Sequence, residues 1–206
     1  MSIFKPKKYK IARRLGAGIY EKTQGQKFML SEAKKAKNKK RGRPNRLSDY
    51  GRQLIEKQKV RFMYGVREKQ FRNYVKKALA QKNDMTPAMR LFTLLESRLD
   101  NVAYRLGLAP TRGAARQLAS HGHLIVNDKR TTIPSQFLKK DDVITIRQGS
   151  KDSVMFADLD KKMSSANAPK WLHWDAKKSQ AQIKGRPTDP DAFLDFQSVI
   201  EFYSRT

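Results

Sequence analysis

Histidine, acidic and hydroxyl side chains are the groups that could catalyse a reaction or hold a metal, and their spacing in this chain supports neither role. His121 and His123 form an HxH pattern, but no third histidine or acidic residue at ligand spacing accompanies them. The absence of cysteine removes thiolate zinc sites, disulfides and thiol nucleophiles together. Nucleotide-loop and nucleophile-elbow patterns are absent, and the aspartate pairs at 158/160 and 189/191 are better explained as helix starts or solvated charges. We therefore expect no catalytic centre, no metal and no cofactor.

The abundant functional side chains in this sequence are those of lysine and arginine, which are positively charged. The chain has 45 Lys and Arg against 19 Asp and Glu, a formal net charge of +26. Such self-repulsion is tolerable where phosphates or counterions neutralise it, and counterion release gives a cationic protein affinity for nucleic acid. The charge is concentrated at the front, because residues 1–47 carry 16 basic and 2 acidic side chains and residues 151–206 carry 9 and 8. This distribution predicts a polyanionic partner rather than a small acidic substrate.

Residues 34–44 form a run of lysine and arginine without apolar periodicity, and alone this run is expected to be disordered. The alternatives are a solvated or localisation tail, or an AT-hook at residues 41–44 (RGRP), which the Gly-Arg-Pro at 185–187 echoes. Ordinary phosphate contacts explain the same residues equally well. The nucleic-acid-binding candidates in the front segment are Arg13, Arg14, Lys40, Arg41, Arg43 and Arg46.

Residues 48–83 predict two helices. Ser48 can cap the first, which Gly65 interrupts, and the second runs from Arg67 to a stop at Asn83. The face opposite the apolar stripe is basic, with amide and aromatic side chains that can stack on bases or hydrogen-bond to sugars. Most aromatics are expected in the core, but Tyr64 and Tyr74 are expected at the nucleic-acid-facing rim. The binding candidates here are Lys57, Gln58, Lys59, Arg61, Tyr64, Gln70, Arg72 and Asn73.

Residues 86–150 predict a small α+β unit. Thr86 and Pro87 start a helix that continues to Gly107, and a second, short helix runs from 110–111 to Gly122. A hairpin with strands at 124–126 and 129–133 follows, and a last strand is expected at 143–147. The unit should present a concave polar edge suited to a folded RNA backbone. Its candidates are Arg112, Arg116, Gln117 and Ser120 on the helix, and His121, His123, Asn127 and Lys129 beside or on the hairpin.

The last segment, residues 151–206, is nearly balanced in charge. It predicts a helix after Ser153, a strand at 171–175 and an apolar end at 199–203. Trp171 and Trp174 are expected to pack in the core or to anchor a protein contact. No apolar run approaches the roughly 20 residues of a membrane span. Residues 1–10 lack an apolar signal segment, so we expect a soluble, intracellular protein, with an arginine-rich transit peptide as the disfavoured alternative.

The middle of the chain resembles the S4 RNA-binding domain, through residues 95–107 (LESRLDNVAYRLG), 111–118, 120–123 and 126–127. That domain also occurs in pseudouridine synthases, tyrosyl-tRNA synthetases and heat-shock proteins, so alone it implies only binding to structured RNA. The flanks at 46–51, 56–61 and 64–74 and the ending at 201–205 are similar to ribosomal protein S4 of the bacterial or organellar small subunit. The matching positions add Arg98, Asn101, Arg105 and Thr111 to the RNA-binding candidates.

The resemblance implies an α+β fold with a small S4 module, of two short helices and a small sheet, inserted in a helical domain. Its expected parts are a basic N-terminal extension at 1–47, a helical rRNA-binding domain at 48–90 completed by 165–206, the S4 domain at 91–150 and a connecting helix at 151–164. Many relatives hold zinc in an N-terminal cysteine cluster. Residues 1–47 contain no cysteine, so no zinc is expected.

The resemblance also implies a role in translation. Family members bind a multi-helix junction of the small-subunit rRNA, nucleate assembly of that region, and contact ribosomal protein S5 at an interface that influences decoding accuracy. Arg43 and Arg46 match positions beside the path by which mRNA enters the subunit. Some relatives repress their own operon. The implied location is the small ribosomal subunit in the cytoplasm, or in an organelle.

Two rivals remain beside this interpretation. An RNA-modifying enzyme could carry the same module, but only 56 residues follow residue 150, too few for a separate catalytic domain. A DNA-binding protein of the AT-hook type would prefer A·T-rich duplex over structured rRNA.

Overall fold

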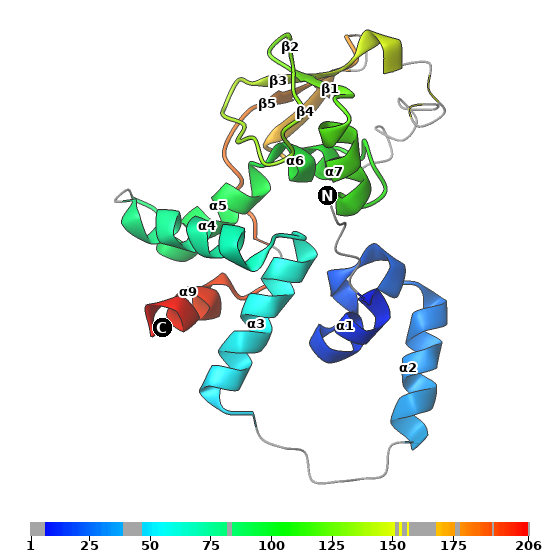
Figure 1. Cartoon of the computed structure of the whole chain (residues 1–206), viewed down its shortest axis with the longest axis vertical. Coiled ribbons are helices and arrows are strands. Elements are labelled where there is room, and N and C mark those ends of the chain that lie inside the picture. The colour runs from blue at the N-terminus through cyan, green and yellow to red at the C-terminus, as the bar shows by residue number, and fades with distance from the viewer. Residues whose placement is uncertain are drawn as a thin grey trace. The chain divides into compact units, whose positions relative to one another are not determined.

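The computed structural model describes residues 7–38, 47–81, 84–150, 153, 156, 168–175, 178–190 and 192–205. The chain divides into two compact units (Figure 1). The helical unit comprises Met1–Leu79 and Asp191–Thr206, and the sheet unit comprises Ala80–Pro190. None of the helices in the described part of the chain has the length and apolarity that a bilayer crossing requires.

The helical unit is built from α1 (Lys8–Leu15), η1 (Ala17–Ile19), η2 (Glu21–Thr23), α2 (Gln26–Asn38), α3 (Asp49–Met63), α4 (Glu68–Ala80) and α9 (Phe196–Ser204). The Ser48 side chain caps α3 by accepting a hydrogen bond from the Gly51 amide at 3.2 Å, and Gly65 follows the helix with a φ of +61°. This confirms the two helices predicted here, although the predicted stop at Asn83 lies outside the described residues.

Helix α9 packs against α3 in the helical unit. Asp195 caps α9 by accepting from the Ser198 amide at 3.0 Å, and α9 buries Val199 and Phe202 among other residues. The ring of Phe202 lies 5.5 Å from that of Tyr50 in α3. Segments almost 150 positions apart are therefore joined, as the 3.1 Å bond between Gln53 and Glu201 across a sequence separation of 148 shows.

The front of the chain has a small core of its own. Its buried residues, packed with partly buried side chains of α3, are Ala12, Leu15, Ile19, Tyr20 and Phe28. Gly16 has a φ of +117°, and a Cβ there would lie 3.0 Å from the ring of Phe193, so this turn requires glycine. The expectation of disorder for residues 34–44 is wrong for 34–38, which form the end of α2, because Phe28 anchors the helix and lysines suit its C-terminus. Residues 39–44 lie outside the described residues.

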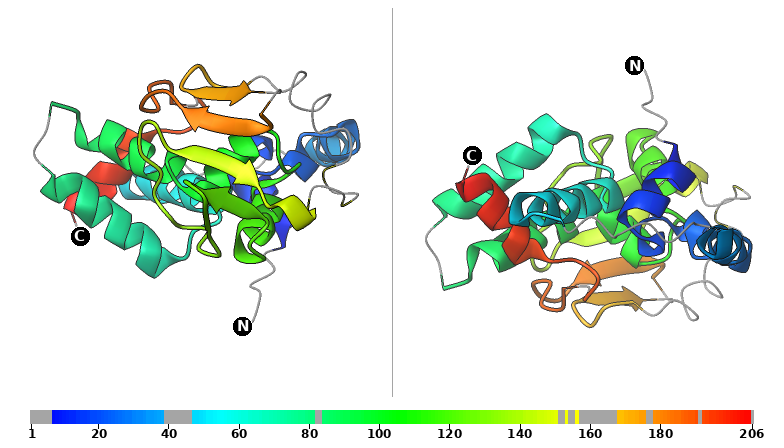
Figure 2. Two further views of the ribbon diagram at one scale, coloured as in Figure 1. Left: turned by 90° about the horizontal axis from the view of Figure 1, so that it is seen from above. Right: turned by 90° about the horizontal axis from the view of Figure 1, so that it is seen from below.

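The sheet unit contains α5 (Pro87–Glu96), α6 (Leu99–Arg105), α7 (Arg112–Ser120), β1 (Leu124–Val126), β2 (Lys129–Arg130), β3 (Val143–Ile146), η3 (Gln148–Ser150), β4 (Leu172–Asp175) and β5 (Gln180–Ile183). The antiparallel sheet has the order β2-β1-β3-β5-β4, with α6 and α7 against one face (Figure 2). Leu124, Ile144 and Ala181 meet Leu99 and Leu118 in its core. The α+β fold class is confirmed.

The single helix predicted from residue 86 to Gly107 is wrong, because the chain breaks between Glu96 and Leu99. Arg98 is extended (φ −75°, ψ 140°), and residues 134–138 pass beside the break. The Leu138 amide donates to the Ser97 carbonyl at 2.8 Å, and the Leu99 amide to the Gln136 carbonyl at 2.9 Å. The apolar spacing continues across the break because Leu91 and Leu95 of α5 and Leu99 and Val102 of α6 are all buried, so the pattern alone cannot reveal it.

The hairpin and the second helix agree with expectation. Thr111 caps α7 by accepting from the Ala114 amide at 3.1 Å, and Gly122 after it has a φ of +72°. Asn127 and Asp128 form the two-residue turn, both with positive φ, which matches a hairpin of type I′. The strand at β2 is shorter than predicted.

The strand predicted at 171–175 is present as β4, but it belongs to the sheet unit. Residues 165–206 were expected to complete the helical domain. Instead β5 pairs with β3, where Ala181 faces Ile144, and only the segment from Asp191 onward joins the helical unit. The weakly apolar β5 was not predicted. The expected connecting helix at 151–164 lies outside the described residues, apart from Ser153 and Phe156.

Candidate nucleic-acid interface

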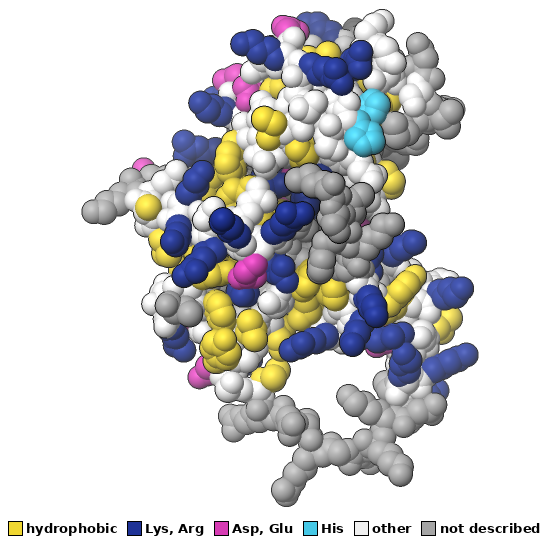
Figure 3. All heavy atoms as spheres, viewed as in Figure 1, with side chains coloured by type: hydrophobic (Ala, Val, Ile, Leu, Met, Phe, Trp, Pro, Cys, Tyr) yellow, Lys and Arg dark blue, Asp and Glu magenta, His cyan; other side chains and the backbone are white. Residues whose placement is uncertain are grey.

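Lysine and arginine side chains lie over both units on the face seen in Figure 3, and acidic side chains there are few. The question is which of the predicted binding residues are exposed and which are used to hold the fold. In the helical unit, Arg14 of α1 and Arg72 and Asn73 of α4 are exposed. Arg13 is exposed too, and it pairs with Glu32 of α2 at 2.7 Å. Lys40, Arg41, Arg43 and Arg46 lie outside the described residues.

Lys57 points inward, contrary to its prediction as a binding residue. Its ammonium lies 2.8 Å from Glu68 Oε1 and 4.8 Å from the centre of the Phe202 ring, and the residue is only 7% exposed. Tyr203 Oη also donates to Glu68 Oε1, at 2.7 Å. Burial acts to raise the pKa of Glu68, but the hydrogen bonds from Lys57 and Tyr203, together with the charges of Lys57 and Arg61, outweigh it and hold that pKa below its ordinary value. Lys57 therefore joins α3, α4 and α9 rather than facing solvent.

The neighbours of Lys57 on α3 are also engaged within the chain. Lys59 pairs with Glu56 at 2.6 Å and lies 5.1 Å from the centre of the Phe193 ring. Arg61 Nη2 donates to Gln58 Oε1 at 2.7 Å, and the guanidinium carbon of Arg61 lies 4.2 Å from the centre of the Phe62 ring. Gln58, Lys59 and Arg61 are half-buried, so RNA could reach only part of each side chain.

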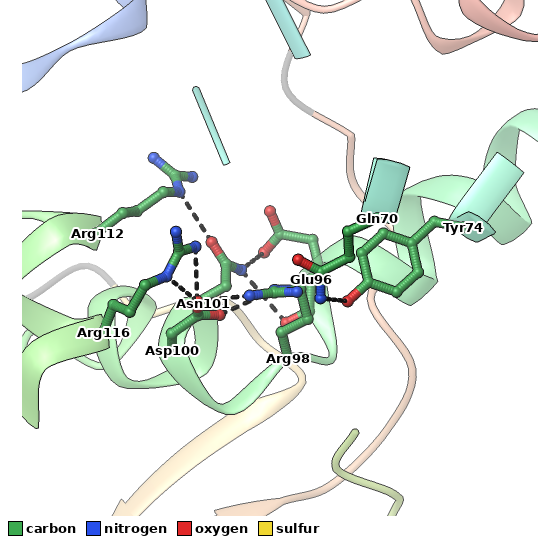
Figure 4. A network of polar contacts seen from close by, with 8 residues as sticks. All are labelled: Gln70, Tyr74, Glu96, Arg98, Asp100, Asn101, Arg112 and Arg116. Carbon is green, nitrogen blue, oxygen red and sulfur yellow. Dashed lines mark hydrogen bonds and ion pairs between the residues drawn. The ribbon is translucent and has the colours of Figure 1, made fainter. Parts of the chain in front are cut away.

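The two tyrosines predicted at the rim are buried instead. Tyr64 and Tyr74 are 2% and 4% exposed, because their rings fill the core between helices and leave no face for a base. Gln70 Nε2 donates to Tyr74 Oη at 3.0 Å, a bond drawn in Figure 4. Gln70 itself is half-buried.

In the sheet unit, two buried carboxylates organise the arginines predicted from the sequence. Asp100 accepts from Arg98 Nε at 3.0 Å and from Arg98 Nη2 at 2.7 Å. Its Oδ2 also accepts from Arg116 Nε at 2.8 Å, with Arg116 Nη2 at 2.7 Å. The side chains of Asp100 and Arg98 are both 3% exposed, whereas that of Arg116 is 35% exposed.

Glu96 holds Arg105 directly and Arg112 through Asn101. Its oxygens accept from Arg105 Nε at 2.9 Å and Nη2 at 2.8 Å, and from Asn101 Nδ2 at 2.8 Å. Asn101 Oδ1 then accepts from Arg112 Nε at 2.9 Å. Figure 4 shows Arg112 and Arg116 reaching from α7 toward Asn101 and Asp100.

This geometry changes the interpretation of Arg98 and Asn101. Both are 2% exposed, and both were predicted to contact RNA. Their polar groups are bonded to buried carboxylates, so in this conformation they support the surface arginines. Thr111, also a candidate, is the cap of α7.

The rest of the predicted edge lies along α7 and the hairpin. Gln117, Ser120, His121 and Lys129 are exposed. His123 Nδ1 lies 2.9 Å from Ser150 Oγ, and the two histidine rings are 5.9 Å apart. Asn127 is exposed, but its side chain closes the hairpin by bonding to Asp142 Oδ1 at 2.8 Å and to the Val143 amide at 2.9 Å.

Sequence reasoning missed two kinds of participant. The acids Glu96 and Asp100 were not considered, because apart from the pair Arg98–Asp100 they lie nine and 16 residues from the arginines that they bind directly. Arg130 was also missed. Its guanidinium lies over Gly122, where a Cβ would be 2.4 Å from Arg130 Nε, and it donates to the carbonyls of Gly122 and His121 at 3.3 Å. Its signal was its position next to Lys129 in the hairpin.

The side chains along this edge have the chemistry to bind an anion. Four arginines and two carboxylates form the cluster, and the carboxylates lie inside while Arg105 and Arg116 reach the surface. Guanidinium groups held in a fixed orientation suit the oxygens of phosphate. Within the described ranges, no group of three or more His, Cys, Asp or Glu residues could hold a metal ion.

Comparison with known proteins agrees with this chemistry. The family model described as "Ribosomal protein S4/S9 N-terminal domain" matches residues 4–96, and the one described as "S4 domain" matches residues 97–144. The chain is 38% identical over 207 residues to the small ribosomal subunit protein uS4 of Chlorobium phaeovibrioides, with all of both chains covered. It is 40% identical over 201 residues to that of Chloroflexus aurantiacus, covering 95% of this chain and 96% of the relative. It is 43% identical over 166 residues to that of Syntrophomonas wolfei, covering 80% and 78%. The chain, with its S4 domain following the matched N-terminal region, therefore belongs to the small ribosomal subunit protein uS4 family.

Proposed function

We propose that this protein is a structural constituent of the small ribosomal subunit that binds small-subunit rRNA directly at a multi-helix junction. The observation that carries the proposal is the row of arginines at the α6–α7 edge of the S4 domain, where Arg105, Arg112 and Arg116 are anchored from beneath by Glu96, Asn101 and Asp100. Membership of the uS4 family confirms that the protein is not an enzyme.

Both units contribute to the RNA-binding surface in this proposal. The exposed candidates in the sheet unit are Gln117, Ser120, His121, Asn127 and Lys129, and those in the helical unit are Arg13, Arg14, Arg72 and Asn73. The net charge of +26 supports a large electrostatic share of the affinity. Neutralising about 6 to 10 phosphates makes affinity fall by roughly 10³ to 10⁵ between 50 and 200 mM salt.

The wider role follows from the family. We propose that binding at the junction nucleates assembly of that part of the subunit, and that the protein contacts ribosomal protein S5 at an interface that influences decoding accuracy. Residues 1–47 were expected to form a separate basic extension, but they belong to the helical unit. Within this segment, Arg43 and Arg46 contribute to the path by which mRNA enters. The proposed location is the small ribosomal subunit in the cytoplasm. These roles are supported by the sequence similarity over the full chain.

Sucrose-gradient sedimentation of cell extract, combined with chemical probing of the rRNA, tests the proposal. The expected result is co-migration with small subunits and protection of one junction by the purified protein. A matched competition separates the remaining alternative, because an AT-hook protein would be displaced by A·T-rich duplex DNA more readily than by structured rRNA. Sedimentation away from ribosomal particles, with no protected junction, would contradict the proposal.

A further inference from the structure

Two buried acidic residues, Glu96 and Asp100, lie directly beneath a surface that is proposed to bind a polyanion. The side chains of Glu96 and Asp100 are 1% and 3% exposed, and they lie beneath arginines whose side chains are 25% and 35% exposed. Each acid subtracts from the positive potential that attracts phosphate. If the surface binds RNA, these two acids must therefore contribute something that compensates for the weaker electrostatic attraction of phosphate.

We propose that Asp100 is a positioning residue for RNA binding, which holds the guanidinium of Arg116 in the orientation that contacts phosphate. This inference rests on the proposed function and adds the means by which the site is preorganised. Asp100 Oδ2 is bonded to Arg116 Nε at 2.8 Å and to Nη2 at 2.7 Å, so two atoms of one guanidinium edge are fixed and its plane is set. Arg98 holds the same carboxylate from the interior through two bonds, so the carboxylate cannot turn to follow the motion of Arg116.

Glu96 and Asn101 do the same for the neighbouring arginines. Glu96 receives two donors of Arg105. Because the Asn101 amide nitrogen donates to Glu96 Oε2 at 2.8 Å, its oxygen must face Arg112 Nε, 2.9 Å away. Arg112 is confined further by the Tyr104 ring, whose centre is 4.4 Å from the guanidinium carbon.

The physical benefit is that rotamer entropy is lost during folding rather than during binding. A long arginine side chain on an open surface would lose its rotational freedom when it meets RNA, which lowers affinity. An arginine already held by a carboxylate loses less, and it presents its donors in the geometry of a phosphate fork. Preorganisation and charge thus predict opposite effects when the acid is removed.

The experiment uses the full chain and an in vitro transcript of a bacterial small-subunit rRNA, with affinity measured by filter retention across a salt series. Asp100→Asn removes one negative charge and keeps the side-chain shape. The control, Asp128→Asn, makes the same change at an exposed turn position with φ +62°, which asparagine tolerates. We expect Asp100→Asn to weaken binding by about fivefold or more, and Asp128→Asn to bind equally or up to about threefold more tightly.

The salt dependence provides a readout that a loss of stability alone would not change. If Asp100→Asn releases Arg116 from its phosphate, the slope of log affinity against log salt should fall by about 1, whereas simple removal of an acid should make it steeper. Binding by Asp100→Asn that equals or exceeds that of the wild type would overturn the inference while leaving rRNA binding intact. If the wild type prefers rRNA no more than it prefers bulk tRNA, the proposed function fails and the inference fails with it.

Arg116→Lys keeps the test decisive even if Asp100→Asn is unstable, and a double-mutant cycle extends the test where both variants fold. Arg116→Lys keeps the charge but loses the planar fork, on a side chain that is partly exposed. We expect it to weaken binding by about fivefold. In the Arg116→Lys background, Asp100→Asn should have little further effect, because Asp100 acts through Arg116. Unchanged binding by Arg116→Lys, or fully additive losses in the double variant, would overturn the inference.

Discussion

The hydroxyl of Tyr203 donates to Glu68 Oε1 at 2.7 Å, and this bond joins the last helix of the chain to α4 across 135 positions. The same carboxylate oxygen receives Lys57 Nζ of α3 at 2.8 Å. One acid therefore links three helices of the helical unit. Burial, the hydrogen bond to Glu68 and the charge of Glu68 all raise the pKa of the Tyr203 hydroxyl, so it remains a donor at neutral pH.

Removing that hydroxyl should loosen the C-terminal helix. Tyr203→Phe deletes the donor and keeps the ring, whose centre lies 6.1 Å from that of Phe71. The free energy of unfolding, measured in urea, should fall by about 1 kcal/mol. This loss is smaller than that expected for a fully buried hydrogen bond to a charged group, because Glu68 is half exposed. Tyr50→Phe is the matched control, since that residue is 60% exposed, and it should change stability by less than about 0.5 kcal/mol. Equal effects of the two substitutions would contradict the role given to Tyr203.

The lowered pKa of Glu68 predicts a specific dependence of stability on pH. Because its folded pKa lies below the unfolded value of about 4.3, ionised Glu68 stabilises the fold. That contribution is complete above the unfolded pKa and is lost as pH falls through the folded pKa. Glu68→Gln cannot ionise, so between about pH 6 and pH 3 its stability should fall less than that of the wild type. The pKa of Asp195 is also lowered, because the hydrogen bonds from Ser198 and the Gln197 amide, with the charge of Lys59, outweigh its burial. This contribution is common to both proteins and cancels. Parallel curves of unfolding free energy against pH would contradict the prediction.

Local rules predicted the elements whose signals lie close together in sequence. Ser48, Thr86 and Thr111 each cap the helix that follows them, and the Asn127–Asp128 turn needs only its own residues. The break at Arg98 could not be predicted in this way. It depends on residues 134–138, which take the hydrogen bonds of the backbone there, and such a partner is invisible to a helical pattern.

The same limit applies to the binding site. A lysine or arginine on a polar helix face looks alike in sequence whether it meets solvent or a buried acid. Lys57 was assigned to the RNA surface because of its charge and Arg98 because of the family resemblance, yet both side chains are buried against acids. Lys57 pairs with Glu68 of the next helix, and Arg98 pairs with Asp100, two residues further along the chain. Exposed Arg72 and Arg14 needed no such partner and were placed correctly on the surface. Charge alone therefore identifies the class of ligand, and burial decides which cations can reach it.

The core of the sheet unit should be sensitive at Leu99, the first residue of α6. It is fully buried and packs in the cluster that joins α6 and α7 to the sheet. Leu99→Ala should lower the free energy of unfolding by about 2 to 5 kcal/mol, because it removes buried methyl groups and leaves a cavity. Ile133→Ala, at a residue that is 59% exposed in the same unit, should change it by less than about 0.5 kcal/mol. Urea denaturation of the full chain checks both, and a loss at Leu99 as small as that at Ile133 would mean that this cluster does not hold the unit together.

Lys57 and Arg72 give a direct test of burial against charge in RNA binding. Each residue is replaced by methionine. Both variants then lose one positive charge from the helical unit, so the loss of long-range electrostatic attraction to RNA is similar in the two. Because Lys57 is enclosed by Glu68 and Phe202, Lys57→Met should leave the affinity for the rRNA transcript within about twofold of the wild type. Arg72 is exposed on α4, and Arg72→Met should lower the affinity by about threefold to tenfold and reduce the salt slope by about 1. Filter retention across the salt series measures both quantities, and circular dichroism shows whether each variant is folded. A larger loss for Lys57→Met than for Arg72→Met, in folded protein, would mean that the helices open when RNA binds and that Lys57 exchanges Glu68 for phosphate.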